Sequence, residues 1–227
     1  METSGDGTIA PTWSGRSATD VAPDLDELIA PVHTAVVTME LQRGVVGDLA
    51  ALPDLRAAAE SVGLPGNAGR LCRAARGAGA RVVHCNAVFR ADRQGSAENC
   101  RMLAASMKLV GELLDEGRPG TENIAELDVQ RSDLIIERSH GLTPFVATEL
   151  DQVLRNMGVR TIVVAGNSLN VGVTGLVLCA VDLGYQVVVA SDAVVGVPID
   201  YGRSVMTNTI SLLATVVSTD DLMAVWS

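Results

Sequence analysis

Six short runs of β-branched and aliphatic residues alternate with helical segments, and this alternation constrains the fold more than any other feature. Strands that alternate with helices form a parallel sheet with helices on both faces. The low aromatic content, 3%, fits this interpretation, because Val, Ile, Leu and Ala fill buried parallel strands. The sequence therefore predicts the α/β class. The predicted strands are residues 34–39, 81–88, 133–137, 160–166, 186–191 and 215–219.

The segments between these strands show helical periodicity, and Pro65-Gly66 interrupts the first of them. The polar segment over residues 1–23 predicts a flexible N-terminal arm, and residues 24–227 one α/β domain. The helical pattern begins at Pro53, before this break, and its second piece covers residues 67–77. The other predicted helices are residues 102–114, 146–158, 171–183, 202–214 and 220–226.

Charge and composition exclude several classes of function. The net charge of −10 opposes binding to nucleic acid. No apolar run reaches the ~20 residues that cross a bilayer, and the first residues lack a signal-peptide core, so we expect a cytoplasmic protein without membrane contact. The four cysteines and three histidines show no zinc-ligand spacing, and we expect neither a metal nor a cofactor.

Ligands of parallel sheets bind beyond the carboxyl ends of the strands, and chemically active residues follow several strands here. Glu40 follows the first strand and is the candidate general acid or base. Arg138, at the end of the third strand, is placed to hold Glu40 ionised or to bind a substrate carboxylate. We predict that Asn86, Phe89 and His140 contact the substrate from the second and third strands.

Each of these residues also has a structural interpretation. Glu40 could be a surface carboxylate, and Arg138 could pair with Glu137 or Glu149. A single histidine in a loop, such as His140, is more often a hydrogen-bonded surface residue.

The segment 166–173 reads as a strand end, a tight turn and a helix start. Backbone N–H groups at such a helix start favour an anion, so Asn167, Ser168, Asn170 and Val173 are candidate substrate-binding residues. The alternative is a helix capped by Ser168 or Asn170. Gly172, at the position where a hydrolase would place its nucleophile, has no side chain and supplies no covalent attack.

The remaining histidine, cysteine and methionine candidates are most simply explained as residues that pack in the core. His84 and Cys85 alternate along the second strand, and free cysteine is usually buried. A thiol mechanism through Cys85 is the weaker alternative. Met102 and Met107 could line an apolar pocket or pack in the core.

The sequence resembles the isochorismatase-like hydrolase superfamily, which includes cysteine amidases. The likeness covers residues 34–219 and is carried by TAVVTMELQRG and by the segment from PGTENIAELD to VVVASDAV. It implies a three-layer αβα sandwich around a six-stranded, mostly parallel, Rossmann-like sheet. It also implies a homo-oligomer, a dimer or tetramer, and a cis peptide at Asn167–Ser168.

The resemblance also assigns roles to residues. The family's Asp, Lys and Cys fall on Glu40, on Arg138 or Ser139, and on Gly172, so this chain departs at all three positions. Isochorismatases also carry Gly in place of Cys and cleave a vinyl ether by proton donation from the acid. The metal-binding residues of zinc nicotinamidases have no counterpart over residues 84–93.

Two hypotheses follow. The first is a hydrolase without a cysteine nucleophile, with Glu40 as general acid or base, acting on a vinyl-ether or C–N bond of a small metabolite that could carry a carboxylate. The second is an inactive family member that binds a metabolite or a partner subunit.

Overall fold

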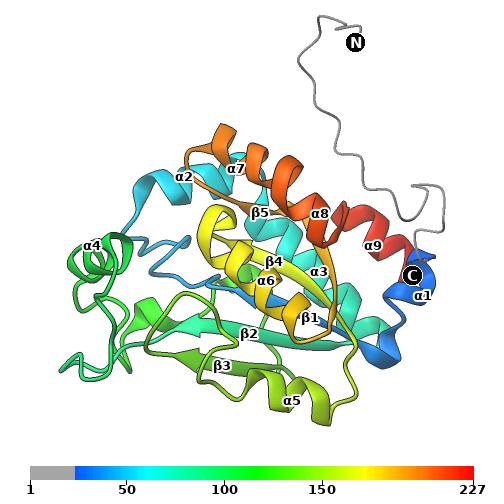
Figure 1. Cartoon of the computed structure of the whole chain (residues 1–227), viewed down its shortest axis with the longest axis horizontal. Coiled ribbons are helices and arrows are strands. Elements are labelled where there is room, and N and C mark those ends of the chain that lie inside the picture. Colours follow the sequence, from blue (N-terminus) through cyan, green and yellow to red (C-terminus); the bar gives the residue numbers. More distant parts are fainter. Residues whose placement is uncertain (1–23) are drawn as a thin grey trace, which may run out of the picture.

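A parallel β-sheet forms the centre of the structure. The computed structural model describes residues 24–227, and the predicted arm over residues 1–23 lies outside the described residues. In the described part the sheet has six strands in the order β3-β2-β1-β4-β5-β6, and every neighbouring pair is parallel. Figure 1 shows β1 and β4 side by side. From β1 the chain adds β2 and β3 on one side, and it then crosses back to add β4, β5 and β6 on the other side. The predicted fold class is confirmed.

The strands follow the apolar runs of the sequence closely. β1 has the predicted bounds, whereas β5 continues past Ser191 to Val195 because its later residues pair with the end of β4. The last strand stops at Val217. The bounds are β1 Thr34–Met39, β2 Arg81–Ala87, β3 Leu134–Arg138, β4 Thr161–Asn167, β5 Gln186–Val195 and β6 Thr215–Val217.

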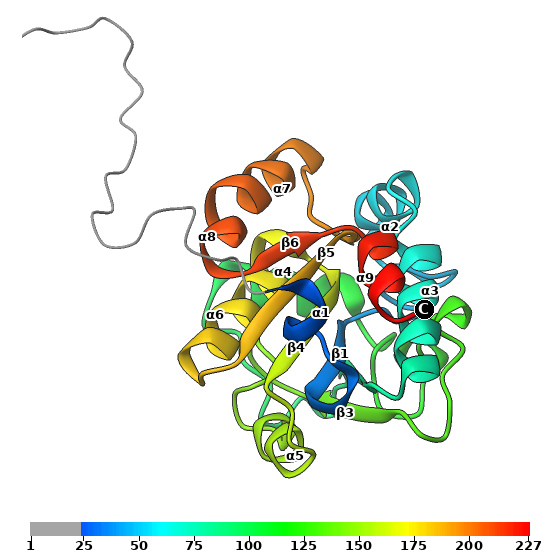
Figure 2. The same ribbon diagram turned by 90° about the vertical axis from the view of Figure 1, so that its right-hand side faces the viewer.

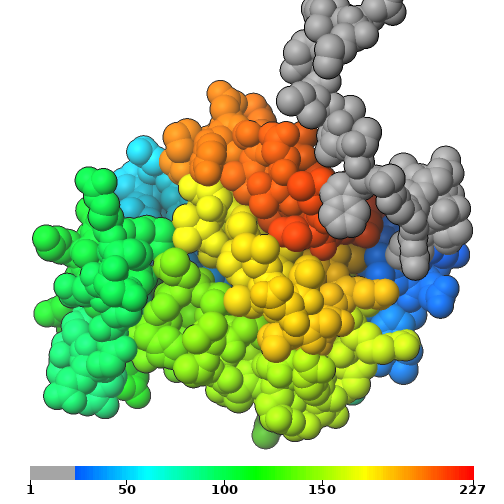
Figure 3. Space-filling model, viewed as in Figure 1, coloured from blue at the N-terminus to red at the C-terminus, as the bar shows by residue number. Residues whose placement is uncertain are grey.

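Two buried clusters, one on each face of the sheet, make the three-layer sandwich. α2, α3 and α9 pack on one face, and α5 to α8 cover the other. Figure 2 shows the two helical layers on opposite sides of the strands. In the space-filling view, α6, α7 and α8 form a continuous surface over their face (Figure 3). The α-helices are α1 Leu25–Leu28, α2 Pro53–Ser61, α3 Leu64–Ala78, α4 Arg101–Val110, α5 Leu150–Asn156, α6 Thr174–Asp182, α7 Ile199–Val205, α8 Ser211–Leu213 and α9 Thr219–Val225.

The break between α2 and α3 corrects one expectation. The chain breaks at Gly63, which has a left-handed φ of 69°, and α3 begins at Leu64. Pro65 and Gly66 therefore lie in the first turn of α3 and do not interrupt it. Proline is tolerated there, because the N–H that it lacks would have no partner in the helix.

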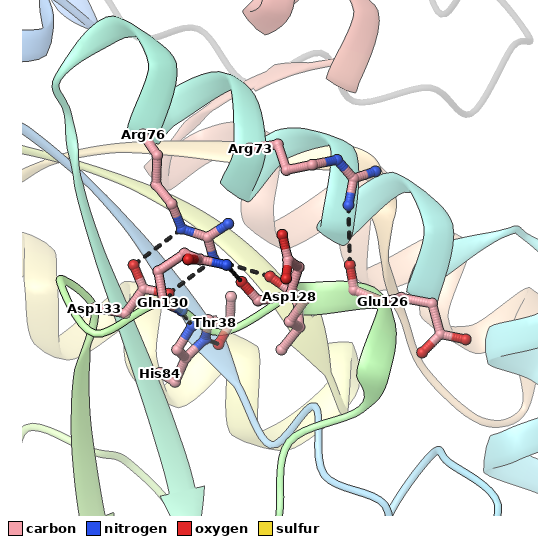
Figure 4. A network of polar contacts seen from close by, with 9 residues as sticks. Thr38, Arg73, Arg76, His84, Glu126, Asp128, Gln130 and Asp133 are labelled. Carbon is pink, nitrogen blue, oxygen red and sulfur yellow. Dashed lines mark hydrogen bonds and ion pairs between the residues drawn. The ribbon is translucent and has the colours of Figure 1, made fainter.

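A polar network crosses the sheet beneath α3 and contains His84. Its ring Nδ1 lies 2.8 Å from the Thr38 hydroxyl, and its Nε2 lies 3.3 Å from Asp133 Oδ2. Arg76, from α3, makes an ion pair with Asp133 at 2.8 Å (Figure 4). His84 is therefore a satisfied buried histidine, which confirms the packing interpretation.

Among residues 24–227, each helix is too short or too polar to cross a membrane.

Candidate functional site

Glu40 occupies a backbone conformation that few non-glycine residues adopt. It follows β1 with φ 51°, in the left-handed region. The Glu40 N–H donates to the Cys85 carbonyl at 2.8 Å, and the Asn167 side chain donates to the Glu40 carbonyl at 2.9 Å. The ends of β2 and β4 thus fix the turn that begins at Glu40.

Arg138 forms an ion pair with Glu40, and this contact connects the ends of β3 and β1. The guanidinium also donates to the Gly141 carbonyl at 2.9 Å, and the side chain is 7% exposed. Burial lowers the pKa of Arg138 to about 10, which still leaves it cationic at neutral pH. Arg138 therefore pairs with the candidate acid and not with Glu137 or Glu149.

The last part of β4 requires glycine at position 166. Gly166 has φ +130°, and a Cβ there would collide with the backbone of Met39 on the adjacent strand. The following Asn167–Ser168 peptide is cis, as the resemblance implies. β4 can therefore approach β1 this closely because Gly166 has no side chain.

A π-helical turn, η4 (Leu169–Val173), leads from β4 into α6. Within residues 24–227 no side chain caps this turn, because the Ser168 hydroxyl bonds to the Asn170 side chain instead. The N–H groups of Val171 and Val173 both donate to the Ser168 carbonyl, at 3.1 and 3.0 Å. These two N–H groups are thus occupied by the Ser168 carbonyl and do not point to an anion. The alternative of a helix capped by Ser168 or Asn170 is not realised.

Gly172 lies on this turn with little room for a side chain. A Cβ would lie 3.0 Å from Met39 Cε and 3.4 Å from the Asn167 carbonyl oxygen. A substitution there would displace the end of the Met39 side chain slightly. Gly172 also borders the cavity described next.

A cavity of about 350 Å³ lies at this edge of the sheet and brings together the ends of β1, β3 and β4. That size suits a small metabolite. Its polar lining includes the Glu40–Arg138 pair and the η4 turn, and α2 and α4 contribute its other walls. The lining residues are Glu40, Val45, Leu52, Asp54, Leu55, Met102, Ser106, Arg138, Leu142, Asn167, Ser168, Asn170, Val171, Gly172 and Val197.

Four predicted site residues lie elsewhere. Val173 is fully buried in the core, and Asn86 is also buried and does not line the cavity. Phe89 and His140 line a smaller adjoining cavity of about 110 Å³, which shares Glu40 and Arg138 with the larger one. The structure therefore brings Phe89 and His140 near the site and leaves Val173 and Asn86 outside it.

Asn167 borders the cavity but is buried. It has no solvent exposure, and its Nδ2 donates to the carbonyls of Met39 and Glu40, at 3.4 and 2.9 Å. The Asn167 side chain therefore positions the turn that carries Glu40.

Cys85 is unsuited to a thiol mechanism. It is 1% exposed, packs in the core on the α5–α6 face and does not line the cavity. Burial strongly raises the pKa of its thiol, so the reactive thiolate is disfavoured. The alternative that recruits Cys85 fails on both geometry and ionisation.

Several lining residues were not predicted from the sequence. Leu52, Asp54 and Leu55 come from the start of α2, a segment whose pattern reads only as a helix. Met102 does line the cavity, and Met107 lines the adjoining one. Across residues 24–227 no three His, Cys, Asp or Glu side chains cluster in a way that could hold a metal ion.

Comparison with known proteins identifies relatives of this fold. Residues 34–221 match the Isochorismatase domain family. The chain is 28% identical over 179 residues to ureidoacrylate amidohydrolase RutB of Serratia proteamaculans, covering 72% of this chain and 70% of the relative. Two solved structures are each 25% identical. A cysteine hydrolase from Pseudomonas syringae pv. phaseolicola has a TM-score of 0.72, covering 88% of this chain and 94% of its own. N-carbamoylsarcosine amidase from Thermoplasma acidophilum has a TM-score of 0.64, and the match covers 83% of this chain and 97% of that structure's chain.

Proposed function

The chain belongs to the isochorismatase family of hydrolases, and from that premise we propose that it hydrolyses a small metabolite by direct attack of water, with Glu40 as general acid and base. Gly172 stands at the position of the family nucleophile, so no covalent intermediate forms there. Arg138 keeps Glu40 ionised before water is activated.

One observation carries this proposal: the Glu40–Arg138 ion pair lies on the wall of a cavity that the Gly172 turn also borders. The pair is largely withdrawn from solvent, with side-chain exposures of 19% for Glu40 and 7% for Arg138. A carboxylate in such a place exchanges protons with a bound substrate rather than with bulk solvent.

The names of two relatives, an amidohydrolase and an amidase, support a C–N bond as the bond that is hydrolysed. In this reaction Glu40 takes a proton from water as the water oxygen attacks the carbonyl carbon. Glu40 then returns the proton to the leaving nitrogen as the C–N bond breaks. Arg138 stabilises the carboxylate at both ends of this cycle.

A vinyl ether is the second candidate bond, and the bare backbone at Gly172 favours it. For this bond Glu40 would start in its protonated form and transfer its proton to the vinyl carbon. Water would add to the resulting cation and return a proton to Glu40, so that no nucleophilic side chain is needed. A family member that binds a metabolite or a partner without turnover is the remaining alternative. Assembly as a dimer or tetramer and residence in the cytoplasm stay predictions.

The test is turnover of a panel of small amides, ureido compounds and isochorismate by the wild-type protein and by Glu40→Gln. The substitution keeps the size of the side chain and removes its proton exchange, so we expect a loss of about 10²–10⁴-fold on any substrate that is turned over. Glu27→Gln, on the exposed face of α1, is the matched control.

Full activity of Glu40→Gln refutes the role of Glu40. Binding of panel compounds without turnover by the wild-type protein would support the binding function instead. Product analysis distinguishes the two bonds, because the amides release an amine or ammonia and the vinyl ether releases pyruvate.

A further inference from the structure

The charged groups of the cavity do not balance. Three charged side chains line it, those of Glu40, Asp54 and Arg138. Glu40 and Arg138 neutralise each other in their ion pair. Across residues 24–227 no ion pair or side-chain hydrogen bond involves Asp54, so the cavity lining has a net charge of −1.

Asp54 occupies the solvent side of the cavity. It lies in the first turn of α2 and is exposed, whereas the deeper Glu40–Arg138 pair is mostly buried. Leu52 and Leu55, its near neighbours in the chain, line the same cavity. A ligand that packs its apolar body against these leucines therefore passes close to the carboxylate of Asp54.

The rest of the lining offers no free cation to a carboxylate. Arg138 is the one basic residue among the lining residues, all of which lie in the described part of the chain, and its guanidinium already binds Glu40 and the Gly141 carbonyl. The remaining walls are largely hydrophobic. Their apolar residues are Val45, Leu52, Leu55, Met102, Leu142, Val171 and Val197.

We propose that this cavity selects substrates whose outer end carries no negative charge, and that Asp54 is the residue that rejects carboxylates. The inference rests on the proposed function, since it names the substrate class for the same site. It narrows the sequence-based expectation, which allowed a carboxylated substrate, to an apolar molecule that is uncharged or cationic at its outer end.

Three benzamides whose outer end is neutral, anionic or cationic test this inference: benzamide, 4-carbamoylbenzoate and 4-(aminomethyl)benzamide. Dissociation constants are measured by ligand-observed NMR titration of the full chain, at low and high salt. We expect the anion to bind at least about fivefold more weakly than benzamide, and the cation at least as tightly as benzamide. High salt should reduce both differences, because salt screens the field of an exposed carboxylate.

Asp54→Asn should reduce the discrimination between benzamide and the anion by about three- to tenfold. Asp54→Ala provides a second variant of the same position. Asp26→Asn is the matched control, because Asp26 also lies exposed in the first turn of a helix, α1, and does not line the cavity. The control should keep the discrimination of the wild-type protein.

Equal or tighter binding of the anion by the wild-type protein overturns the inference, as does unchanged discrimination in both Asp54 variants or no binding of any of the three ligands. Turnover is recorded separately on the same ligands and on the panel above. Charge-selective binding without hydrolysis of any compound refutes the proposed function and leaves the role of Asp54 standing.

Discussion

Arg138 and Glu40 form an ion pair although β2 lies between their two strands in the sheet. Glu40 follows β1 and Arg138 ends β3, so the two side chains meet above the carboxyl end of β2. The N–H of Glu40 donates to the carbonyl of Cys85, close to that end. The candidate catalytic pair is thus held by three strands at once.

Replacing Arg138 should separate the contribution of its charge from that of its shape. Arg138→Met keeps the length of the side chain and leaves Glu40 without its cation, so we expect a loss of about 3 kcal/mol in unfolding free energy and more than tenfold in activity. Arg138→Lys keeps the charge and should lose no more than about 1 kcal/mol. Urea unfolding and steady-state kinetics measure the two effects. An active Met variant would show that the ion pair is structural only.

Gly172→Ala tests whether the reaction needs the bare backbone at the η4 turn. The new methyl group would lie 3.0 Å from the end of Met39, which is flexible, so the unfolding free energy should fall by less than about 1 kcal/mol. Hydrolysis should fall at least about tenfold if water attacks over this backbone. Gly175→Ala, one turn further along α6, meets only Thr143 at 3.8 Å and is the control. Equal activity of both variants would argue against water attack at this place.

Gly166→Ala should be strongly destabilising, because its Cβ would overlap the backbone of β1 and its φ of +130° disfavours any side chain. We expect a loss of about 3 kcal/mol or more, seen in thermal or urea unfolding. Gly79→Ala is the control, since Gly79 also has a positive φ but a Cβ there would meet no atom of residues 24–227 within 4 Å. It should cost about 1 kcal/mol. Similar losses for the two variants would show that the collision with β1 does not matter.

Acid should destabilise the fold through His84. Burial lowers the pKa of His84 below 6.5, so the folded protein keeps the ring neutral while the unfolded chain takes up a proton. The stability is therefore fully present above about pH 6.5 and falls as the pH drops below it, by up to about 1.4 kcal/mol per pH unit.

Thermal unfolding between pH 7.5 and 5.5 measures this dependence. His84→Gln should be less stable at pH 7.5 but should show a shallower decline, and His140→Gln, outside the network, should decline like the wild-type protein. A decline as steep in His84→Gln as in the wild-type protein would contradict the assignment to His84.

The neutral ring also fixes the hydrogen bonds of the network. The carboxylate of Asp133 can only accept, so Nε2 carries the proton, and Nδ1 accepts from the Thr38 hydroxyl. The pKa of Asp133 is lowered, because burial alone would raise it but the bonds from Arg76 and the Gln130 N–H outweigh burial. Below pH 3.8 its protonation would therefore weaken the same network further.

The positions of Glu40 and Arg138 could be predicted from sequence because the rule for parallel sheets depends only on where strands end. The strand ends themselves were readable from β-branched runs such as residues 34–39. Asp54 could not be predicted in this way. Its helix pattern records which face of α2 packs inward, and it carries no information on which strand end that helix reaches.

The sequence by itself determined the α/β class, the strands, the family and the acid at the end of β1, because local periodicity and residue identity suffice for each. Tertiary structure alone decided that Val173 and Asn86 are buried, that Arg138 pairs with Glu40 across β2, and that α2 brings the Asp54 carboxylate to the cavity. These outcomes depend on which elements become neighbours in space. Such long-range packing is set by the whole core and is not encoded in any single segment.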